Sequence, residues 1–268
     1  MKEKLEELKR ILSSYGRVAV AFSSGVDSAF LLAVAKEVLG ENVLAVTATS
    51  NAFPKRESRE ALEFCQDYQI RQLFVEFHES ETPGFAENPK NRCYICKRQL
   101  FTSMKEAVSK EGFEVLAEGT NVDDHGDYRP GIQAIRELGI LSPLKLAGLT
   151  KAEIRALSKE MGLPTWEKPS YACLASRFVY GETITKEKLA MVEAAEELLL
   201  AMGFRQMRVR IHGNLARIEV EPCDFTRVME EENRIRIHRE FKQLGFAYVA
   251  LDLQGFRSGS MNETLKLN

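Results

Sequence analysis

The chain has little excess of either charge and no long hydrophobic run, and each absence excludes a class of protein. Its 268 residues include 37 Lys and Arg against 39 Asp and Glu, a net charge of −2 at pH 7, with no block of basic residues. Strong non-specific binding to nucleic acid is therefore not expected. No run of about 18 apolar residues is present to cross a membrane. Residues 1–12 predict a charged amphipathic helix rather than a signal peptide, so we expect a cytoplasmic protein.

Cysteine is scarce and odd in number, which argues against a framework of disulfides. Five cysteines are present, and two of them, Cys93 and Cys96, have C-x-x-C spacing. This pattern suits a reducing compartment and a metal or redox role. Cys65 falls on the apolar face of a predicted helix and Cys223 in a turn, so neither is expected to carry chemistry.

Short apolar runs alternate with helical segments in the first part of the chain. Strands are predicted at 18–22, 42–49, 72–77 and 114–117, and helices at 29–39, 55–68 and 94–110. Repeated β-α units of these lengths favour the α/β class. They predict an open, doubly wound parallel sheet whose ligand site lies at the carboxyl ends of the strands.

The pattern changes beyond a long loop at 163–184. Before the loop, Thr150 and Glu153 have the spacing of a capping box and open a predicted helix. After the loop, the chain predicts a helix at 185–202, strands at 207–212 and 215–221, a helix at 225–244 and a strand at 248–253. We therefore predict two domains: residues 1–180 with the nucleotide site, and residues 181–268 as a smaller α+β domain for substrate binding or oligomerisation.

The turn after the first predicted strand is the most informative segment of the chain. Residues 18–28 read VAVAFSSGVDS, an apolar strand followed by a small polar turn and a helix. Such a turn places backbone N–H groups and a helix N-terminus in front of an anion. It lacks the Lys of a G-x-x-x-x-G-K-[ST] loop, so it is not an ordinary P-loop. A Ser-rich helix cap without a ligand is the alternative.

This turn resembles the SGGVDS pyrophosphate loop of the PP-loop ATP pyrophosphatases, enzymes that split ATP between the α and β phosphates. Five of the six positions match, and Ser24 stands where the family usually has Gly. A positive φ at Ser24 would cost about 1–2 kcal/mol relative to Gly, so we expect a negative φ there. Asp27 beside phosphate calls for Mg²⁺ between them. The expected nucleotide-binding residues are Ala21, Ser23, Ser24, Gly25, Val26, Asp27, Ser28, Thr47, Gly119 and Thr120.

A second polar cluster, residues 119–131, follows the fourth predicted strand. Asp123, Asp124 and Asp127 would repel one another unless they are solvated, hydrogen-bonded or bound to a metal. Solvation of a loop is the plain interpretation. The position opposite the pyrophosphate loop favours a role with Mg²⁺ or ribose, and we expect Asp27 and Asp124 as the magnesium ligands.

The third cluster, residues 168–177, reads KPSYACLASR and is followed by Tyr180 and Gly181. It closely resembles the central signature of the ATP-dependent sacrificial sulfur transferases, PP-loop enzymes that act in assembly of the nickel-pincer nucleotide cofactor of lactate racemase. The resemblance covers nearly the whole chain, with further matches at 92–94, 119–131, 141–144, 208–210 and 216–219. The cysteine loop and the GTNVDD segment are its specific parts.

The resemblance implies a reaction as well as a fold. ATP adenylates a pyridinium carboxylate mononucleotide with release of pyrophosphate, and the thiolate of Cys173 displaces AMP to form a thioester. Cleavage of the Cys Cβ–S bond then leaves a thiocarboxylate on the substrate and dehydroalanine on the protein. The expected catalytic residues are Cys173, Ser176, Arg177 and Glu196, and the expected substrate-binding residues are Arg208, Arg210 and Asp224.

The structural alternatives for these charged residues are ordinary ones. Arg208 and Arg210 lie two apart on a predicted strand and share one face, which would otherwise be a solvated face. Either this pair or Arg177 is suited to hold the substrate phosphate. Glu193, Glu196 and Glu197 lie on the preceding helix. One of them could be the base for Cβ–S cleavage, although solvation at the surface is the expected state of each separately.

Cys93, Cys96 and Cys173 form a three-thiolate set that could hold a [4Fe–4S] cluster with one iron free. Some relatives of the family are thought to carry a sulfide on such an iron, which would make Cys173 a ligand rather than the sulfur donor. A zinc site, three unligated thiols, or a redox pair at Cys93 and Cys96 are the alternatives.

Other functions remain open on the same nucleotide loop. A tRNA-thiolating enzyme demands a basic surface, which the net charge of −2 does not provide. An ammonia-dependent amidating ligase and a non-catalytic nucleotide-binding protein are further alternatives. The family resemblance also implies ATP and Mg²⁺ as cofactors, a small-molecule nucleotide as substrate, and a homo-oligomer.

Overall fold

The computed structural model describes residues 1–125, 130–169, 171–257 and 259–265. The chain forms two compact units. The first comprises Met1–Thr82 and Cys93–Tyr171, and the second comprises Pro83–Arg92 and Ala172–Asn268. The boundary therefore falls after Tyr171, where the sequence suggested residue 180, and a short segment from the middle of the chain joins the second unit.

The first unit is built on a four-stranded parallel sheet. Its strands are β1 (Val18–Ala21), β2 (Val43–Thr49), β3 (Arg71–Glu76) and β4 (Leu116–Ala117). Their order is β3-β2-β1-β4, and every pairing is parallel. The strand order reverses beside β1, and in open α/β sheets a ligand binds at such a switch point.

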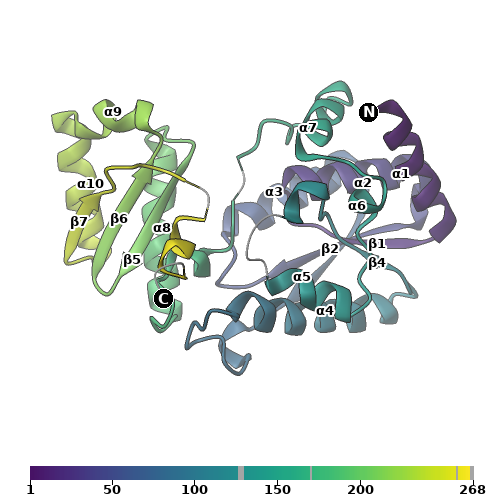
Figure 1. The fold of residues 1–268 in the computed structure, drawn as a ribbon, viewed down its shortest axis with the longest axis horizontal. Coiled ribbons are helices and arrows are strands. Elements are labelled where there is room, and N and C mark those ends of the chain that lie inside the picture. Colours follow the sequence, from purple (N-terminus) through teal and green to yellow (C-terminus); the bar gives the residue numbers. More distant parts are fainter. Residues whose placement is uncertain (126–129, 170, 258, 266–268) are drawn as a thin grey trace. The chain divides into compact units, whose positions relative to one another are not determined.

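Helices cover both faces of this sheet, as the sequence predicted. One face carries α1 (Lys2–Tyr15), α2 (Val26–Leu39), α3 (Lys55–Asp67), α6 (Pro143–Leu146) and α7 (Lys151–Glu160), and the other carries α4 (Arg92–Lys110) and α5 (Pro130–Glu137) (Figure 1). The side chains of β1 alternate between two cores, with Val18 and Val20 in one and Ala19 in the other. The doubly wound α/β class is confirmed.

The second unit has a three-stranded sheet of mixed direction. Its elements are α8 (Lys186–Ala201), β5 (Met207–His212), β6 (Leu215–Val220), α9 (Phe225–Met229), α10 (Glu231–Gln243) and β7 (Tyr248–Leu251). Strands β5 and β6 pair antiparallel, whereas β6 and β7 pair parallel. Helix α8 packs on β5, and α10 packs on α8 and β7. This is the smaller α+β fold that the sequence predicted.

The single helix predicted at 225–244 is wrong. The chain is extended at Glu230 (φ −52°, ψ 137°), which separates α9 from α10. The Nδ2 of Asn233 donates to the Arg227 carbonyl oxygen at 2.8 Å and to the Glu230 carboxylate at 3.1 Å, which stabilises the turn. The acidic residues at the start of α10 also favour a new helix N-terminus. No helix in the described part of the chain is long and apolar enough to cross a membrane.

Candidate functional site

The pyrophosphate loop connects β1 to the N-terminus of α2. Helix α2 begins at Val26, three residues earlier than predicted, because Gly25 adopts an extended N-cap conformation (φ −77°, ψ 163°). Asp27 and Ser28 therefore lie in the first helical turn. The Ser28 hydroxyl accepts from the Ser23 amide at 3.3 Å and donates to the Gly25 carbonyl oxygen at 3.2 Å. These bonds close the loop around the helix N-terminus, where anions are stabilised.

The negative φ expected for Ser24 is wrong. Ser24 has φ 53°, in the left-handed region that favours glycine, and only 1% of its surface is exposed. The ammonium of Lys168 donates to both the carbonyl oxygen and the hydroxyl of Ser24, each at 2.8 Å. These two bonds offset the backbone cost of a non-glycine residue in this conformation.

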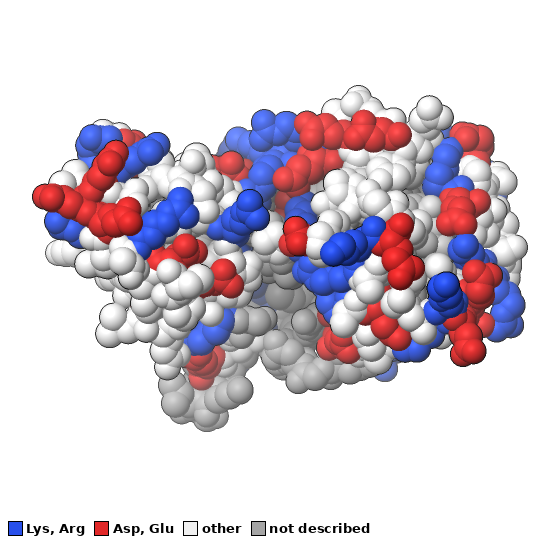
Figure 2. Space-filling view, turned by 90° about the horizontal axis from the view of Figure 1, so that it is seen from above, with Lys and Arg blue, Asp and Glu red and all other residues white. Residues whose placement is uncertain are grey.

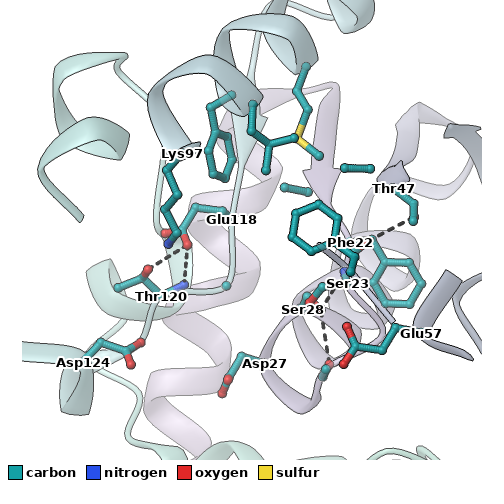
Figure 3. Close-up of a pocket in the computed structure, with 18 of the residues that line it drawn as sticks. Phe22, Ser23, Asp27, Ser28, Thr47, Glu57, Lys97, Glu118, Thr120 and Asp124 are labelled. Carbon is teal, nitrogen blue, oxygen red and sulfur yellow. Dashed lines mark hydrogen bonds between the residues drawn. The ribbon is translucent and has the colours of Figure 1, made fainter. Parts of the chain in front are cut away.

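A cavity of about 520 Å³ opens in front of the loop at the carboxyl ends of the strands (Figure 3). This volume is within the usual range of small-molecule sites. Predicted residues that line it are Ala21, Ser23, Gly25, Asp27, Ser28, Thr47, Gly119, Thr120 and Asp124. Ser24 and Val26 are not among the lining residues, and both side chains are buried. The structure thus brings most of the predicted nucleotide residues to one cavity.

The carboxylates of this cavity are paired rather than simply solvated. Asp27 forms an ion pair with the Lys151 ammonium and accepts from the Asn121 side chain at 3.3 Å. The Lys151 amide donates to Asp123 at 2.8 Å, and the Asn121 amide donates to Asp124 at 3.0 Å. Asp127, the third member of the predicted acidic cluster, lies outside the described residues, as does Ser170 of the signature segment.

Gly119 is required by a close approach of two backbones. A Cβ atom at this position would lie 3.0 Å from the Ser28 nitrogen and 3.2 Å from the Asp27 Cβ. The chain leaving β4 can therefore pack against the first turn of α2 only because residue 119 has no side chain. This contact positions Thr120 and Asn121 beside Asp27.

Several residues of the cavity were not predicted. Glu118 is 7% exposed and accepts from the Thr120 amide at 3.0 Å and the Thr120 hydroxyl at 2.7 Å, and also from Ser142. Lys97 and Lys151 supply positive charge, and Glu57 adds a carboxylate. The capping box was a usable signal for Lys151, because it placed this residue at a helix N-terminus. For Lys97 and Glu57 the sequence carries no comparable signal.

In the second unit, Cys173 caps a 3₁₀ helix, Leu174–Arg177. Arg177 has no exposed surface, and its Nε and Nη2 donate to the two carboxylate oxygens of Glu196 at 2.9 and 2.8 Å. Its Nη1 donates to the carbonyl oxygens of Ala172 and Cys173 at 2.7 and 3.1 Å and to the Ser176 hydroxyl at 2.8 Å. This guanidinium holds the cysteine loop, and the phosphate-binding role considered for it does not fit its buried contacts.

Glu196 is not at the surface, contrary to expectation. It is 6% exposed, pairs with Arg177 and accepts from the Val209 amide at 2.9 Å. Burial by itself would raise the pKa of this carboxyl, but the charge and hydrogen bonds of Arg177 hold the pKa of Glu196 below its usual value. A carboxylate so stabilised is a weak base, and its contacts indicate a positioning role rather than proton abstraction.

The solvated strand face considered for Arg208 and Arg210 is also wrong. Both are buried, at 4% and 5% exposure. Arg210 donates to the Glu219 carboxylate at 2.9 and 3.0 Å and to the Ser176 carbonyl oxygen at 3.0 Å. Arg208 lies over the ring of Phe256, 4.9 Å from its centroid. Asp224 is in the following turn, with its carboxylate near that of Glu221 and the thiol of Cys223.

The segment before α4 also holds the cysteine loop. Arg92, the last residue of Pro83–Arg92, is 4% exposed and donates to the Ala175 carbonyl oxygen at 2.8 Å and to the Asn88 side chain at 2.5 Å. The carbonyl oxygens at 172, 173, 175 and 176 thus all accept from buried arginines of the second unit. The backbone around Cys173 is fixed by this arrangement, which the sequence did not predict.

The five cysteines differ in setting. Cys93 and Cys96 lie three apart at the start of α4 and are partly exposed, which places their thiols on one side of the helix. Cys173 belongs to the second unit, so the three-thiolate set stays a prediction. Burial raises the pKa of Cys65 to about 12, which leaves its thiol inert, and Cys223 is exposed.

The sheet order, the loop between β1 and α2, and the cavity in front of it are the features of a PP-loop domain. One chain of the glutamine-hydrolysing GMP synthase of Thermoplasma volcanium is 27% identical over 199 residues, which are 69% of this chain and 63% of that protein. No family model matches the chain.

A second comparison is more specific. The pyridinium-3,5-bisthiocarboxylic acid mononucleotide synthase of Lactiplantibacillus plantarum is 36% identical over 255 residues, 95% of this chain and 92% of that enzyme. The chain belongs to the family of this synthase, the ATP-dependent sulfur transferases of the PP-loop class, and is an enzyme. An uncharacterized Synechocystis protein is 40% identical over 265 residues, 99% of both chains.

Proposed function

We propose that the chain adenylates a pyridinium carboxylate mononucleotide with ATP and converts it to a thiocarboxylate for synthesis of the nickel-pincer nucleotide. The observation that carries this proposal is the 36% identity to the synthase, which extends over 95% of the chain and therefore spans both units. The tRNA-thiolating and amidating alternatives are not favoured, because the GMP synthase relatives match less of the chain at lower identity.

ATP binds in the cavity of the first unit in this proposal. The loop amides and the N-terminus of α2 would bind the β and γ phosphates, and Thr47, Gly119 and Thr120 would line the adenosine side. The carboxylates of Asp27 and Asp124 are oxygen donors suited to Mg²⁺, and Asp27 already meets a cation in Lys151. Mg²⁺ held by Asp27 and Asp124 would neutralise charge between these carboxylates and the phosphates.

Sulfur transfer takes place at Cys173. Its thiolate attacks the acyl carbon of the adenylate, the carbon–oxygen bond to AMP breaks, and a thioester forms. Removal of the Cys173 Cα proton then breaks the Cβ–S bond. The electron pair leaves with sulfur as the thiocarboxylate, and dehydroalanine remains in the chain. The proton acceptor is a group other than Glu196, whose carboxylate is bound by Arg177.

A second sulfur source is favoured by the cysteine pair on α4. Two thiols on one side of a helix turn can bind one metal centre, and Cys93 and Cys96 meet that condition. A [4Fe–4S] cluster held by Cys93, Cys96 and Cys173 would supply a sulfide from its open iron. In this version Cys173 is a ligand, and the chain is not consumed.

Replacement of Cys173 tests the proposal. Cys173→Ala should retain pyrophosphate release from ATP and the carboxylate substrate but form no thiocarboxylate, because adenylation takes place in the first unit. Cys223→Ala, which removes an exposed thiol of the same unit, is the matched control and should form product normally. Thiocarboxylate formation by Cys173→Ala would remove this residue from the mechanism.

The second unit would bind the substrate and assemble the oligomer. Arg208, Arg210 and Asp224 are proposed for the substrate side, and the buried positive charge on β5 supports a phosphate nearby. Weaker binding of the mononucleotide, but not of ATP, to Arg208→Ala would support this assignment. A homo-oligomer is proposed from the family, and a monomeric mass by light scattering would contradict it.

The remaining partners follow from charge and cysteine content. Acidic and basic side chains are intermixed on the face seen in Figure 2, which supports a small-molecule substrate over nucleic acid. Salt-dependent binding of tRNA would contradict this. We also propose the cytoplasm as the site of action, because its reducing conditions keep Cys173 as a thiol. Fractionation of cells that express the tagged chain tests that location.

A further inference from the structure

Ser24 occupies a backbone conformation that its residue type disfavours. Its φ of 53° is in the left-handed region, and L-residues other than Gly, Asn and Asp rarely adopt it. A left-handed residue within a turn helps to aim successive N–H groups into one concavity, which is how such loops bind phosphate. The loop therefore needs the conformation, and some other group must hold Ser24 in it.

Lys168 is that group. Its ammonium donates to the Ser24 carbonyl oxygen and the Ser24 hydroxyl, each at 2.8 Å, and also pairs with Glu60 on α3. The Lys168 side chain is only 14% exposed. Binding two oxygens of one residue constrains both its backbone and its side chain. An exposed Lys–Glu pair would not do this.

The backbone of Lys168 is itself fixed. Arg155 of α7 donates to the carbonyl oxygens of Trp166 and Lys168 at 2.6 and 2.9 Å, and the Lys168 amide donates to the Thr165 carbonyl oxygen at 2.9 Å. The ammonium therefore lies at the end of an anchored arm. Lys168 is not among the residues that line the nucleotide cavity, so it acts on the loop rather than on the ligand.

We propose that Lys168 is a positioning residue of the ATP site: it holds Ser24 in the left-handed conformation and thereby fixes the loop amides that bind phosphate. This inference rests on the proposed function, because it assigns ATP to that loop. It also gives the first residue of the KPSYACLASR segment a role distinct from that of Cys173 in the same segment.

A double-mutant cycle on ATP binding tests the proposal. Lys168→Met should weaken ATP binding and raise KM for ATP about tenfold or more, with a smaller change in kcat, as expected for a lost charge-assisted contact. In the Ser24→Gly background the same Lys168→Met change should cost less than about threefold, because glycine adopts positive φ without support. Lys110→Met, which removes an exposed ammonium from α4, is the matched control.

The outcomes separate this inference from the proposed function. Wild-type protein that binds no ATP would overturn both. Wild-type protein that binds ATP, with Lys168→Met binding equally well or equally impaired in both backgrounds, would overturn only the role of Lys168. If Lys168→Met fails to fold, Ser24→Ala replaces it: loss of the hydroxyl acceptor with the side-chain cost retained should weaken ATP binding several-fold, and unchanged binding overturns the proposal.

Discussion

Arg177 and Glu196 form an ion pair in the interior of the second unit, and this burial determines what both residues do. Two charges removed from water are costly unless their hydrogen bonds are satisfied, and here each oxygen of Glu196 meets a guanidinium nitrogen. The pair also orders the loop, because the remaining donors of Arg177 bind the backbone beside Cys173. At the residue scale, charge is used here mainly to hold the reactive segment.

The first prediction concerns stability and its pH dependence. Glu196→Gln should lower the free energy of unfolding by about 3–5 kcal/mol near pH 7, since it leaves the Arg177 charge uncompensated. The folded pKa of Glu196 is held below 4.5. Its contribution is therefore present above that pH and is lost as the pH falls through the folded pKa. Urea unfolding from pH 3 to 7 should show a smaller difference between wild type and variant at the acid end.

Parallel curves for the two proteins across this range would contradict the assignment, because they would mean that Glu196 titrates alike in the folded and unfolded states. Glu193→Gln, on the same helix and without the buried ion pair to Arg177, provides the comparison for changes due to net charge.

A second residue-scale prediction concerns Asp27. Asp27→Asn should lower the rate of pyrophosphate release about 100-fold, the scale expected when one electrostatic group of a reaction centre is removed. Thermal unfolding should change little, because Asp27 lies at the cavity and not in the core. Glu63→Gln, an exposed carboxylate on α3, is the control. Pyrophosphate release at the wild-type rate by Asp27→Asn would remove ATP from this cavity.

At the scale of elements, short segments connect the chemistry to rigid structure. The pyrophosphate loop is held between β1 and α2, and the segment that leaves β4 can approach it because Gly119 has no side chain. The Cys173 loop has no strand or long helix of its own. Its carbonyl oxygens are held instead by Arg92, Arg177 and Arg210.

This arrangement predicts that Arg92 affects one step of the reaction and not the other. Arg92→Met should leave pyrophosphate release within about twofold of wild type but slow thiocarboxylate formation about 10- to 100-fold, since misplacing a reacting group by about 1 Å has effects of this size. Arg98→Met, an exposed position on the same helix, is the matched control. An equal loss of both steps would show that Arg92 only supports the fold.

At the scale of the whole molecule, the sequence predicted what depends on periodicity and local motifs. The apolar runs at 18–22 and 42–49 predicted parallel strands, and the Thr150–Glu153 capping box is present as expected. The pyrophosphate loop and its cavity followed from one turn motif. These features depend on neighbours along the chain.

Long-range contacts could not be predicted in the same way. The conformation of Ser24 depends on Lys168, 144 positions away in the chain. Arg208 and Arg210 have the alternation of a solvated strand, and only tertiary carboxylates such as Glu219 show why they are buried. The assignment of residues 83–92 to the second unit likewise rests on contacts with the cysteine loop.

The most direct test of the central claim, ATP-dependent sulfur transfer at Cys173, is the intact mass and visible absorbance of anaerobically purified protein before and after turnover. The reaction contains ATP, Mg²⁺ and the pyridinium carboxylate mononucleotide. The account predicts thiocarboxylate product together with the loss of one H₂S from Cys173. Product with unchanged mass and iron–sulfur absorbance would assign Cys173 as a cluster ligand. No product, with neither change, would contradict the claim.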